Sequence, residues 1–184
     1  MKKQHFLFTR FSINASLFQK GFIQKKVNKY LHLTLMKKLP NIPLRYAAQS
    51  GSLACLKYAF NFIKEINEID NNWTLCHAAK SGSLACLKYA HNVIKANDVT
   101  NWTLCYAAES GSLDCLKYAH NVIKATDVRN WTLGDAAESG SLDCLKYAHN
   151  VIKATDVNDE TLNSAAKSGN IFCIEYCKKY FSIK

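Results

Sequence analysis

The sequence predicts an all-α solenoid in which five helical hairpins stack in series, because the chain repeats itself. Four windows align almost residue for residue, and a decayed fifth copy follows them: Leu44–Lys64, Leu75–Lys95, Leu104–Lys124, Leu133–Lys153 and Leu162–Ile183. One glycine marks the register of each copy, at 51, 82, 111, 140 and 169, so the spacing is 31, 29, 29 and 29 residues. A period of this length is typical of stacked units that bury their apolar faces against one another.

The first element of a unit is a short helix, as the copy at 102–130 illustrates. Thr103 is the expected N-cap of a helix over Leu104–Glu109, in which Leu104, Ala107 and Ala108 form an apolar stripe with helical spacing. The Ala-Ala pair leaves room for neighbouring helices to approach closely. Gly111 then ends the helix, because glycine adopts the left-handed conformation without strain.

The second element is a longer helix from Leu113 to about Lys124, with Ser112 as its N-cap and Asp114 in its first turn. Helical spacing predicts one buried stripe and three positions that flank it. The stripe comprises Leu113, Leu116, Ala119 and Ile123, and the flanking positions are Cys115, Tyr118 and Val122. A return loop over 125–130 completes the hairpin.

The chain therefore divides into a basic extension and a repeat array. The extension covers residues 1–41, and the array covers 42–184 with units at 42–72, 73–101, 102–130, 131–159 and 160–184. Trp73, Trp102 and Trp131 open the three middle units, while Ile42 and Glu160 take that place in the first and last. Atypical terminal units are what capping of a solenoid requires.

The repeated core resembles the ankyrin-repeat family. The best match is Ile42–Leu53 (IPLRYAAQSGSL), beside a family pattern of roughly T-P-L-H-x-A-A-x-x-G-H-L. The other copies keep the Leu, the Ala-Ala pair, the Gly and the following Leu, but have Trp-Thr in place of Thr-Pro and are about four residues shorter than the usual 33. They are similar to the divergent arrays of protists and of the giant viruses that infect them. The resemblance implies a non-catalytic protein-binding module or scaffold.

Arrays of this kind usually bind partners through their loops and the exposed face of the short helix. Positions on that face vary between the copies while the core does not, which makes them the candidate protein contacts. They are Tyr46, Gln49, His77, Lys80, Tyr106, Glu109, Asp135 and Glu138.

The eight cysteines are predicted to be reduced residues of the core. Cys55, Cys86, Cys115, Cys144 and Cys173 share one repeat position. Equivalent positions in stacked helices lie roughly 8–10 Å apart, too far for a disulfide, and a buried thiol behaves as a small hydrophobe. Cys76 and Cys105 are the expected exceptions, since Gly134 and Asn163 occupy their place later. A reducing compartment follows, either the cytoplasm or the mitochondrial matrix.

Two further ladders run through the repeats. One His per unit, at 91, 120 and 149, lies too far from the next to share a metal ion, so these are packing or surface residues. Lysines recur at 57, 88, 117 and 146, and again seven residues later. This second ladder is either a solvated face or a basic stripe for an acidic protein or for phosphate.

The net charge of +10 belongs to the N-terminal third, because residues 1–64 hold twelve basic residues and no acidic one. An amphipathic helix is expected over 22–39. The preceding residues resemble a mitochondrial presequence, and they would equally serve as an RNA-binding arm. The basic candidates for RNA or another anionic surface are Lys2, Lys3, Arg10, Lys20, Lys25, Lys26, Lys29, Lys37 and Lys38.

The sequence carries none of the common catalytic motifs, such as a P-loop, G-x-S-x-G or H-E-x-x-H. It predicts no enzyme, cofactor, metal or small-molecule substrate. No apolar run reaches the ~20 residues of a transmembrane helix. The main hypothesis is a protein-interaction scaffold, and the alternative is a structural subunit of a large assembly, such as a mitochondrial ribonucleoprotein, anchored to RNA through residues 1–40.

Overall fold

The computed structural model describes residues 44–65, 73–97, 102–126, 131–155 and 160–181, without the side chains of 62–65. The chain divides between Ile42 and Pro43 into two units, and all described residues belong to the second. The basic extension with its expected helix over 22–39, and the loops between repeats, lie outside the described residues.

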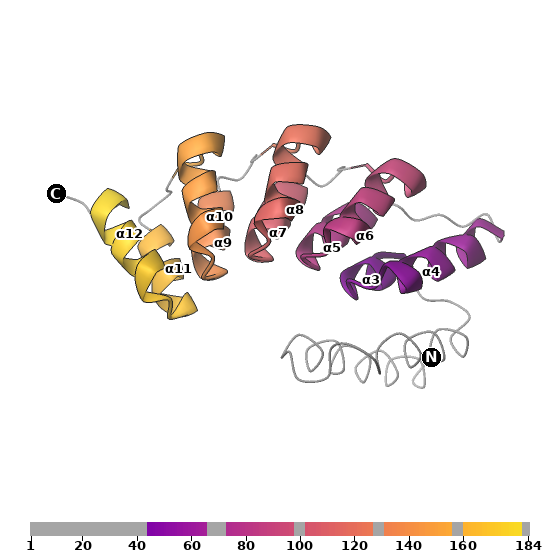
Figure 1. Ribbon diagram of the computed structural model, residues 1–184, viewed down its shortest axis with the longest axis horizontal. Coiled ribbons are helices and arrows are strands. Elements are labelled where there is room, and N and C mark those ends of the chain that lie inside the picture. Colours follow the sequence, from indigo (N-terminus) through magenta and orange to yellow (C-terminus); the bar gives the residue numbers. More distant parts are fainter. Residues whose placement is uncertain (1–43, 66–72, 98–101, 127–130, 156–159, 182–184) are drawn as a thin grey trace. The chain divides into compact units, whose positions relative to one another are not determined.

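Each repeat is a hairpin of a short and a longer helix, as predicted, and the described residues contain no strand. The short helices are α3 (Leu44–Gln49), α5 (Thr74–Lys80), α7 (Thr103–Glu109), α9 (Thr132–Glu138) and α11 (Glu160–Ser168). The longer ones are α4 (Leu53–Glu65), α6 (Leu84–Tyr89) with η1 (Ala90–Ile94), α8 (Leu113–Tyr118) with η2 (Ala119–Ile123), α10 (Leu142–Tyr147) with η3 (Ala148–Ile152), and α12 (Ile171–Phe181). Figure 1 shows these pairs following one another along the array.

The hairpins are joined mainly through their short helices, which pack in series from α3 through α5, α7 and α9 to α11. The Ala-Ala pair permits this approach: Ala107 and Ala108 are fully buried, like their equivalents in the neighbouring units. Leu104 and Leu116 complete the core of the third repeat. Burying one such leucine contributes about 1.5–3 kcal/mol, so the repeated leucines supply a large share of the stability.

A Ser-Gly-Ser turn connects the two helices of the first four repeats. In the third, Ser110 Oγ donates to the carbonyl of Ala107 at 2.7 Å and accepts from the backbone N–H of Ser112 at 3.2 Å. Ser112 Oγ then accepts from the N–H of Cys115 at 3.4 Å, which confirms it as the N-cap of α8. Gly111 has φ +70°, the left-handed conformation that glycine adopts most easily. Asn170 replaces the second serine in the last repeat and caps α12 through Oδ1.

The end of the long helix differs from the prediction, because the helix widens into a π turn before it stops. In the third repeat the N–H groups of Lys124 and Ala125 both point to the carbonyl of Ala119. Such a closure needs a left-handed residue at the helix end, and Lys124 takes it with φ 60° and ψ 33°. Ala125 follows it into the core, and this burial favours the closure.

The predicted N-cap at Thr103 is wrong. Helix α7 begins at Thr103, and Trp102 occupies the cap position without a side-chain hydrogen bond to the helix. The threonine side chain is fully buried, so its methyl group packs in the core. Its hydroxyl oxygen has no hydrogen-bond partner among the described residues.

The buried stripe of the long helix is displaced from the predicted one. Cys115 is fully buried rather than flanking, whereas Leu113 and Ile123 are only partly buried. Cys115 and Leu116 are both fully buried, and the thiols of Cys86 and Cys144 in the adjacent long helices lie near that of Cys115. Val122 is outside the stripe as expected, and it is 52% exposed.

The expected exposure of two cysteines is also wrong. Cys76 is 1% exposed and Cys105 is 2% exposed. Both lie on short helices, which pack against the short helices of the repeats before and after them. All eight cysteines are buried.

A repeated hydrogen-bonded clamp connects successive long helices. The hydroxyl of Tyr118 lies 3.1 Å from Nδ1 of His91 and accepts from Nδ2 of Asn92 at 3.0 Å. Because the asparagine already donates to this oxygen, the hydroxyl hydrogen is available to the histidine nitrogen. The same clamp holds Tyr147 and Tyr176 in the following repeats. The histidine ladder is therefore a packing device between repeats.

Candidate protein-binding face

A continuous row of aromatic side chains runs along the short-helix side of the second to fourth repeats. Trp73 contacts His77 with a centroid distance of 6.1 Å, and His77 contacts Tyr106 of the next repeat at 6.1 Å. The ring centroid of Trp102 lies 5.3 Å from that of Tyr106 and 5.2 Å from that of Trp131 in the following repeat. Trp73 is 36% and Trp131 43% exposed. Large aromatic side chains at a surface are the residues that most often dominate protein–protein binding.

The row exists because the short helix starts with its Trp-Thr pair. The threonine and the following leucine are buried, so the preceding tryptophan is left at the helix entrance. A residue four positions later, such as His77 or Tyr106, lies on the same helical face. The ring contacts of the aromatic row therefore depend on Trp at the cap position and on an aromatic residue four positions later.

Charged side chains flank the aromatic row, and some of them form ion pairs with each other. Lys80 Nζ lies 2.8 Å from Glu109 of the next repeat and 4.7 Å from the ring centroid of Tyr106. The guanidinium of Arg45 lies 5.0 Å from the ring of Tyr46. Basic residues thus stand on the first two short helices, while Glu109, Asp135 and Glu138 stand on the next two.

His77, the second residue of the aromatic row, is held in one tautomer by a hydrogen bond to the backbone. Its Nδ1 lies 2.9 Å from the carbonyl of Trp73, so Nδ1–H is the donor. Burial lowers the pKa of His77 most, the hydrogen bond to the Trp73 carbonyl opposes that shift, and the charges of Arg45 and Lys80 lower it further. The imidazole is therefore neutral at pH 7 and presents an aromatic rather than a cationic surface.

All eight predicted contact residues lie on short helices. Each is partly or well exposed: Tyr46, Gln49, His77, Lys80, Tyr106, Glu109, Asp135 and Glu138. The structure brings His77, Tyr106, Lys80 and Glu109 together in one cluster. Their role in binding a partner stays a prediction.

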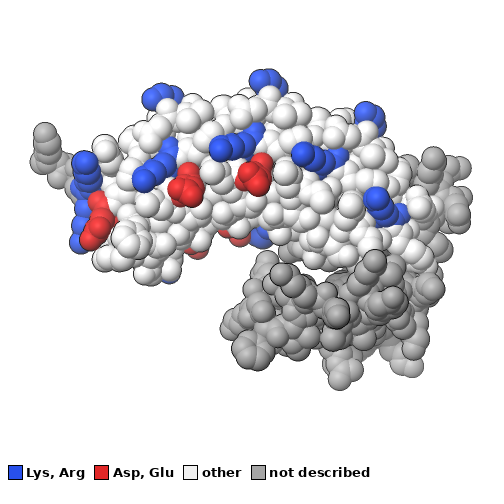
Figure 2. All heavy atoms as spheres, viewed as in Figure 1, with Lys and Arg blue, Asp and Glu red and all other residues white. Residues whose placement is uncertain are grey.

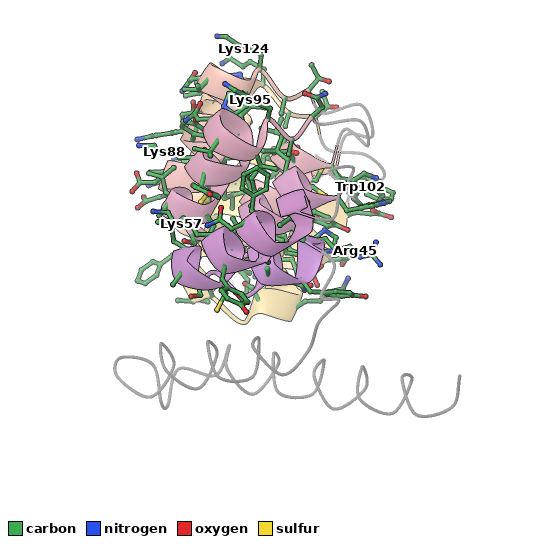
Figure 3. The ribbon with its side chains drawn as sticks, turned by 90° about the vertical axis from the view of Figure 1, so that its right-hand side faces the viewer. Arg45, Lys57, Lys88, Lys95, Trp102 and Lys124 are labelled. Carbon is green, nitrogen blue, oxygen red and sulfur yellow. The ribbon has the colours of Figure 1, made fainter. Side chains whose placement is uncertain are left out.

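The sequence patterns did not single out the tryptophans as candidate contact residues. Trp73, Trp102 and Trp131 served only as markers of the middle repeats, although their recurrence before a buried Thr-Leu pair is the signal of a surface row. Figure 3 shows Trp102 and Arg45 on one side of the array and Lys57 and Lys88 on the opposite side. The nine basic candidates of the extension lie outside the described residues.

The thiols of the core are poor nucleophiles. Burial raises the pKa of Cys55, Cys86, Cys115, Cys144 and Cys173, and this is the largest effect on each. Only a thiolate reacts or binds metal, so these side chains act as small apolar residues.

Two features are absent from the described residues, a cluster of metal ligands and a membrane-spanning helix. Within these residues no three His, Cys, Asp or Glu side chains are grouped so that they could hold a metal ion. None of the described helices has the length and apolar character needed to cross a membrane.

No curated protein matches the sequence. The family described as ankyrin repeats (three copies) matches residues 44–129, which carry the first three hairpins and most of the aromatic row. Proteins of this family generally mediate protein–protein interactions and are typically non-catalytic. Residues 44–129 therefore match the ankyrin-repeat family, in agreement with the resemblance predicted from the sequence.

Proposed function

We propose that this protein is a non-catalytic scaffold that binds a protein partner through the short-helix face of its repeats. The observation that carries the proposal is the unbroken row Trp73–His77–Tyr106–Trp102–Trp131. A partner that covers this row would bury aromatic surface at its centre, with charged pairs at its rim, which is the usual organisation of a protein interface.

The charges along the face define the partner further. Arg45 and Lys80 favour acidic groups near the first two repeats, and Asp135 and Glu138 favour basic groups near the fourth. An elongated segment with an apolar middle, an acidic end and a basic end would complement both. Because Lys80 is already paired with Glu109, we expect the partner's charges to affect orientation more than affinity.

The test is affinity capture from the native source with the full-length protein, followed by titration of the purified partner. Trp73→Ser and Trp131→Ser should each weaken binding by about 30-fold, as expected of a residue that contributes about 2 kcal/mol. Lys117→Ala and Lys146→Ala, on the opposite side, should leave the affinity unchanged. If all four variants bind like the wild type, while circular dichroism shows intact helices, the short-helix face is not the interface.

The sequence also favours a second function, that of a structural subunit anchored to RNA by residues 1–40. Its support is the acid-free composition of the extension, which lies outside the described residues. RNA affinity that falls steeply with salt and disappears when residues 1–40 are deleted would support this role. Absence of RNA binding by the full-length protein at low salt would remove it. A reducing compartment, the cytoplasm or the mitochondrial matrix, is proposed from the buried thiols.

A further inference from the structure

The two helical layers of the array differ in charge, and the layer of long helices is the more basic one. On the described short helices Arg45, Lys80 and Lys167 are outnumbered by acidic residues. The long helices and the residues that end them carry exposed lysines, and the acidic side chains described on these helices are Asp114, Asp143 and Glu175. The recurring lysines are Lys57, Lys88, Lys95, Lys117, Lys124, Lys146 and Lys153, and we call this set the lysine face. Figure 2 shows basic side chains recurring along this side of the array, with acidic side chains beside two of them.

One row of the lysine face is held in place by the next repeat. The ammonium groups of Lys57, Lys88 and Lys117 lie 5.6, 5.7 and 5.9 Å from the ring centroids of Tyr89, Tyr118 and Tyr147. These tyrosines are the same residues that the repeats clamp or stack upon. These three contacts favour one orientation of the lysine side chains, which reduces the entropy lost on binding.

The second row occupies a backbone position that does not favour lysine. Lys95, Lys124 and Lys153 end their π turns with φ of 59–60°, where glycine or asparagine is usual. The negative end of the helix dipole compensates a cation there in part. Even so, the fold itself needs only a residue that tolerates the left-handed conformation. Lysine recurs at this strained position in all three repeats, which indicates a use for its charge.

The chemistry of the lysine face selects phosphate over a protein surface. Between the two rows stand Asn92, Asn121 and Asn150, all exposed. Protein interfaces are depleted in lysine and organised around aromatic or apolar anchors. Beside this stripe the exposed apolar residues are single valines, Val93, Val122 and Val151, and the tyrosines under the lysines are partly buried. Lysine and asparagine are, in contrast, common donors to the phosphate and sugar of nucleic acids.

The same face favours a duplex over a single strand. Proteins that bind single strands stack the bases on aromatic side chains. The tryptophans of this array are on the short-helix side, and Figure 3 shows Trp102 opposite Lys57 and Lys88. A duplex presents its phosphates outward and needs no such stacking. We propose that the lysine face binds the phosphate backbone of a nucleic-acid duplex without reading its sequence, so that the array holds a protein on one side and a duplex on the other.

The test compares two triple variants of the full chain that lose the same charge. Lys95→Gly, Lys124→Gly and Lys153→Gly together remove the second row while supplying the residue that the left-handed turn prefers. Arg45→Met, Lys80→Met and Lys167→Met remove three charges from the short helices. Binding of a fluorescent random-sequence DNA duplex is measured by anisotropy over a range of KCl concentrations. Each phosphate contact contributes about 0.9 to the slope of log affinity against log salt, so the glycine variant should lose about 3 of that slope and the methionine variant none.

Several outcomes would overturn the proposal. Equal slopes for the two variants would assign any binding to the extension or to net charge. Failure of the full chain to bind the duplex at low salt would exclude the face as a nucleic-acid site. Binding of polyglutamate or of phosphatidylserine vesicles without duplex binding would identify an acidic protein or a membrane as the partner class. Thermal unfolding of the glycine variant at or above the wild-type temperature verifies that it folds.

Discussion

Single residues of this array differ sharply in how much stability they carry, and neighbours in the sequence give the clearest contrast. Leu116 is fully buried between the helices of its repeat, while Lys117 is exposed. Leu116→Ala should lower the free energy of unfolding by about 2–5 kcal/mol, because it removes buried contacts and leaves a cavity. Chemical denaturation followed by circular dichroism measures the loss.

Lys117→Ala is the matched control for this prediction. Its ammonium lies 5.9 Å from the Tyr147 ring, a contact at an exposed site, so the substitution should change the stability by no more than about 0.5 kcal/mol. Similar losses in the two variants would show that the buried face of the long helix has been assigned incorrectly.

His77 links stability to pH. Because its pKa is lowered in the folded state, chiefly by burial, the unfolded chain binds the proton more readily than the folded one. The stability should therefore fall as the pH drops below the unfolded pKa of about 6.5. His77→Gln should reduce the loss of stability between about pH 7 and 5 that urea titrations detect. An unchanged pH dependence in this variant would mean that His77 titrates alike in both states.

At the residue scale, the sequence predicted the core leucines and alanines but misplaced several neighbours. Leu104, Ala107, Ala108 and Leu116 are buried as expected. Cys76 was misjudged because a glycine or asparagine at the same repeat position was taken as a sign of exposure. Repeat position alone does not fix burial: Asn163, in the last repeat, is exposed, while Cys76 is enclosed between two neighbouring units.

At the scale of elements, the clamp between long helices should contribute to the coupling of adjacent repeats. Tyr147 loses hydrogen bonds to both His120 and Asn121 when it is replaced by phenylalanine. A typical intramolecular hydrogen bond contributes about 0.5–1.5 kcal/mol, so Tyr147→Phe should lower the free energy of unfolding by about 1–2 kcal/mol. Equilibrium denaturation in urea checks the value.

Tyr89→Phe provides the comparison, because Phe60 occupies the histidine position before it. The two rings meet edge to face at 6.1 Å, an apolar contact that phenylalanine retains. This variant should therefore cost clearly less than Tyr147→Phe. Equal costs would assign the effect to the tyrosine ring environment rather than to the His-Asn clamp.

The helical hairpins themselves were predictable, and the way their long helices end was not. Period, glycine turn and Ser112 cap follow from local residue preferences that recur in each copy. The π turn over Ala119–Ile123 depends on backbone bonds that close onto one carbonyl and on the burial of Ala125. Glycine is the usual sequence signal for a left-handed residue that ends a helix. Lys124 gives no such signal, so the sequence predicts a regular helix that continues to about this residue.

For the array as a whole, stability is expected to be a sum over repeats and their interfaces, which makes the ends weaker than the middle. The last repeat illustrates this. A Cβ atom built on Gly169 would meet no atom within 4 Å, whereas one on Gly111 would meet Ser139 of the next repeat at 3.6 Å. Ile171 and Phe172 are 56% and 63% exposed. The fifth repeat thus lacks, among the described residues, the covering neighbour that the inner repeats have.

The eight buried cysteines give a direct test of this gradient. They are distributed over all five repeats, with Cys173 and Cys177 in the last and Cys105 and Cys115 in the third. Burial raises the pKa of Cys115 and Cys173 and hides both thiols, so a thiol reagent can label them only after local or global opening. Under native reducing conditions, labelling followed by peptide mass spectrometry should modify Cys173 and Cys177 first and the cysteines of the third repeat most slowly.

Uniform labelling rates at all eight positions would mean that the array opens only as one cooperative unit. Early labelling of Cys76 or Cys105 would show that the short helices separate before the end of the array frays.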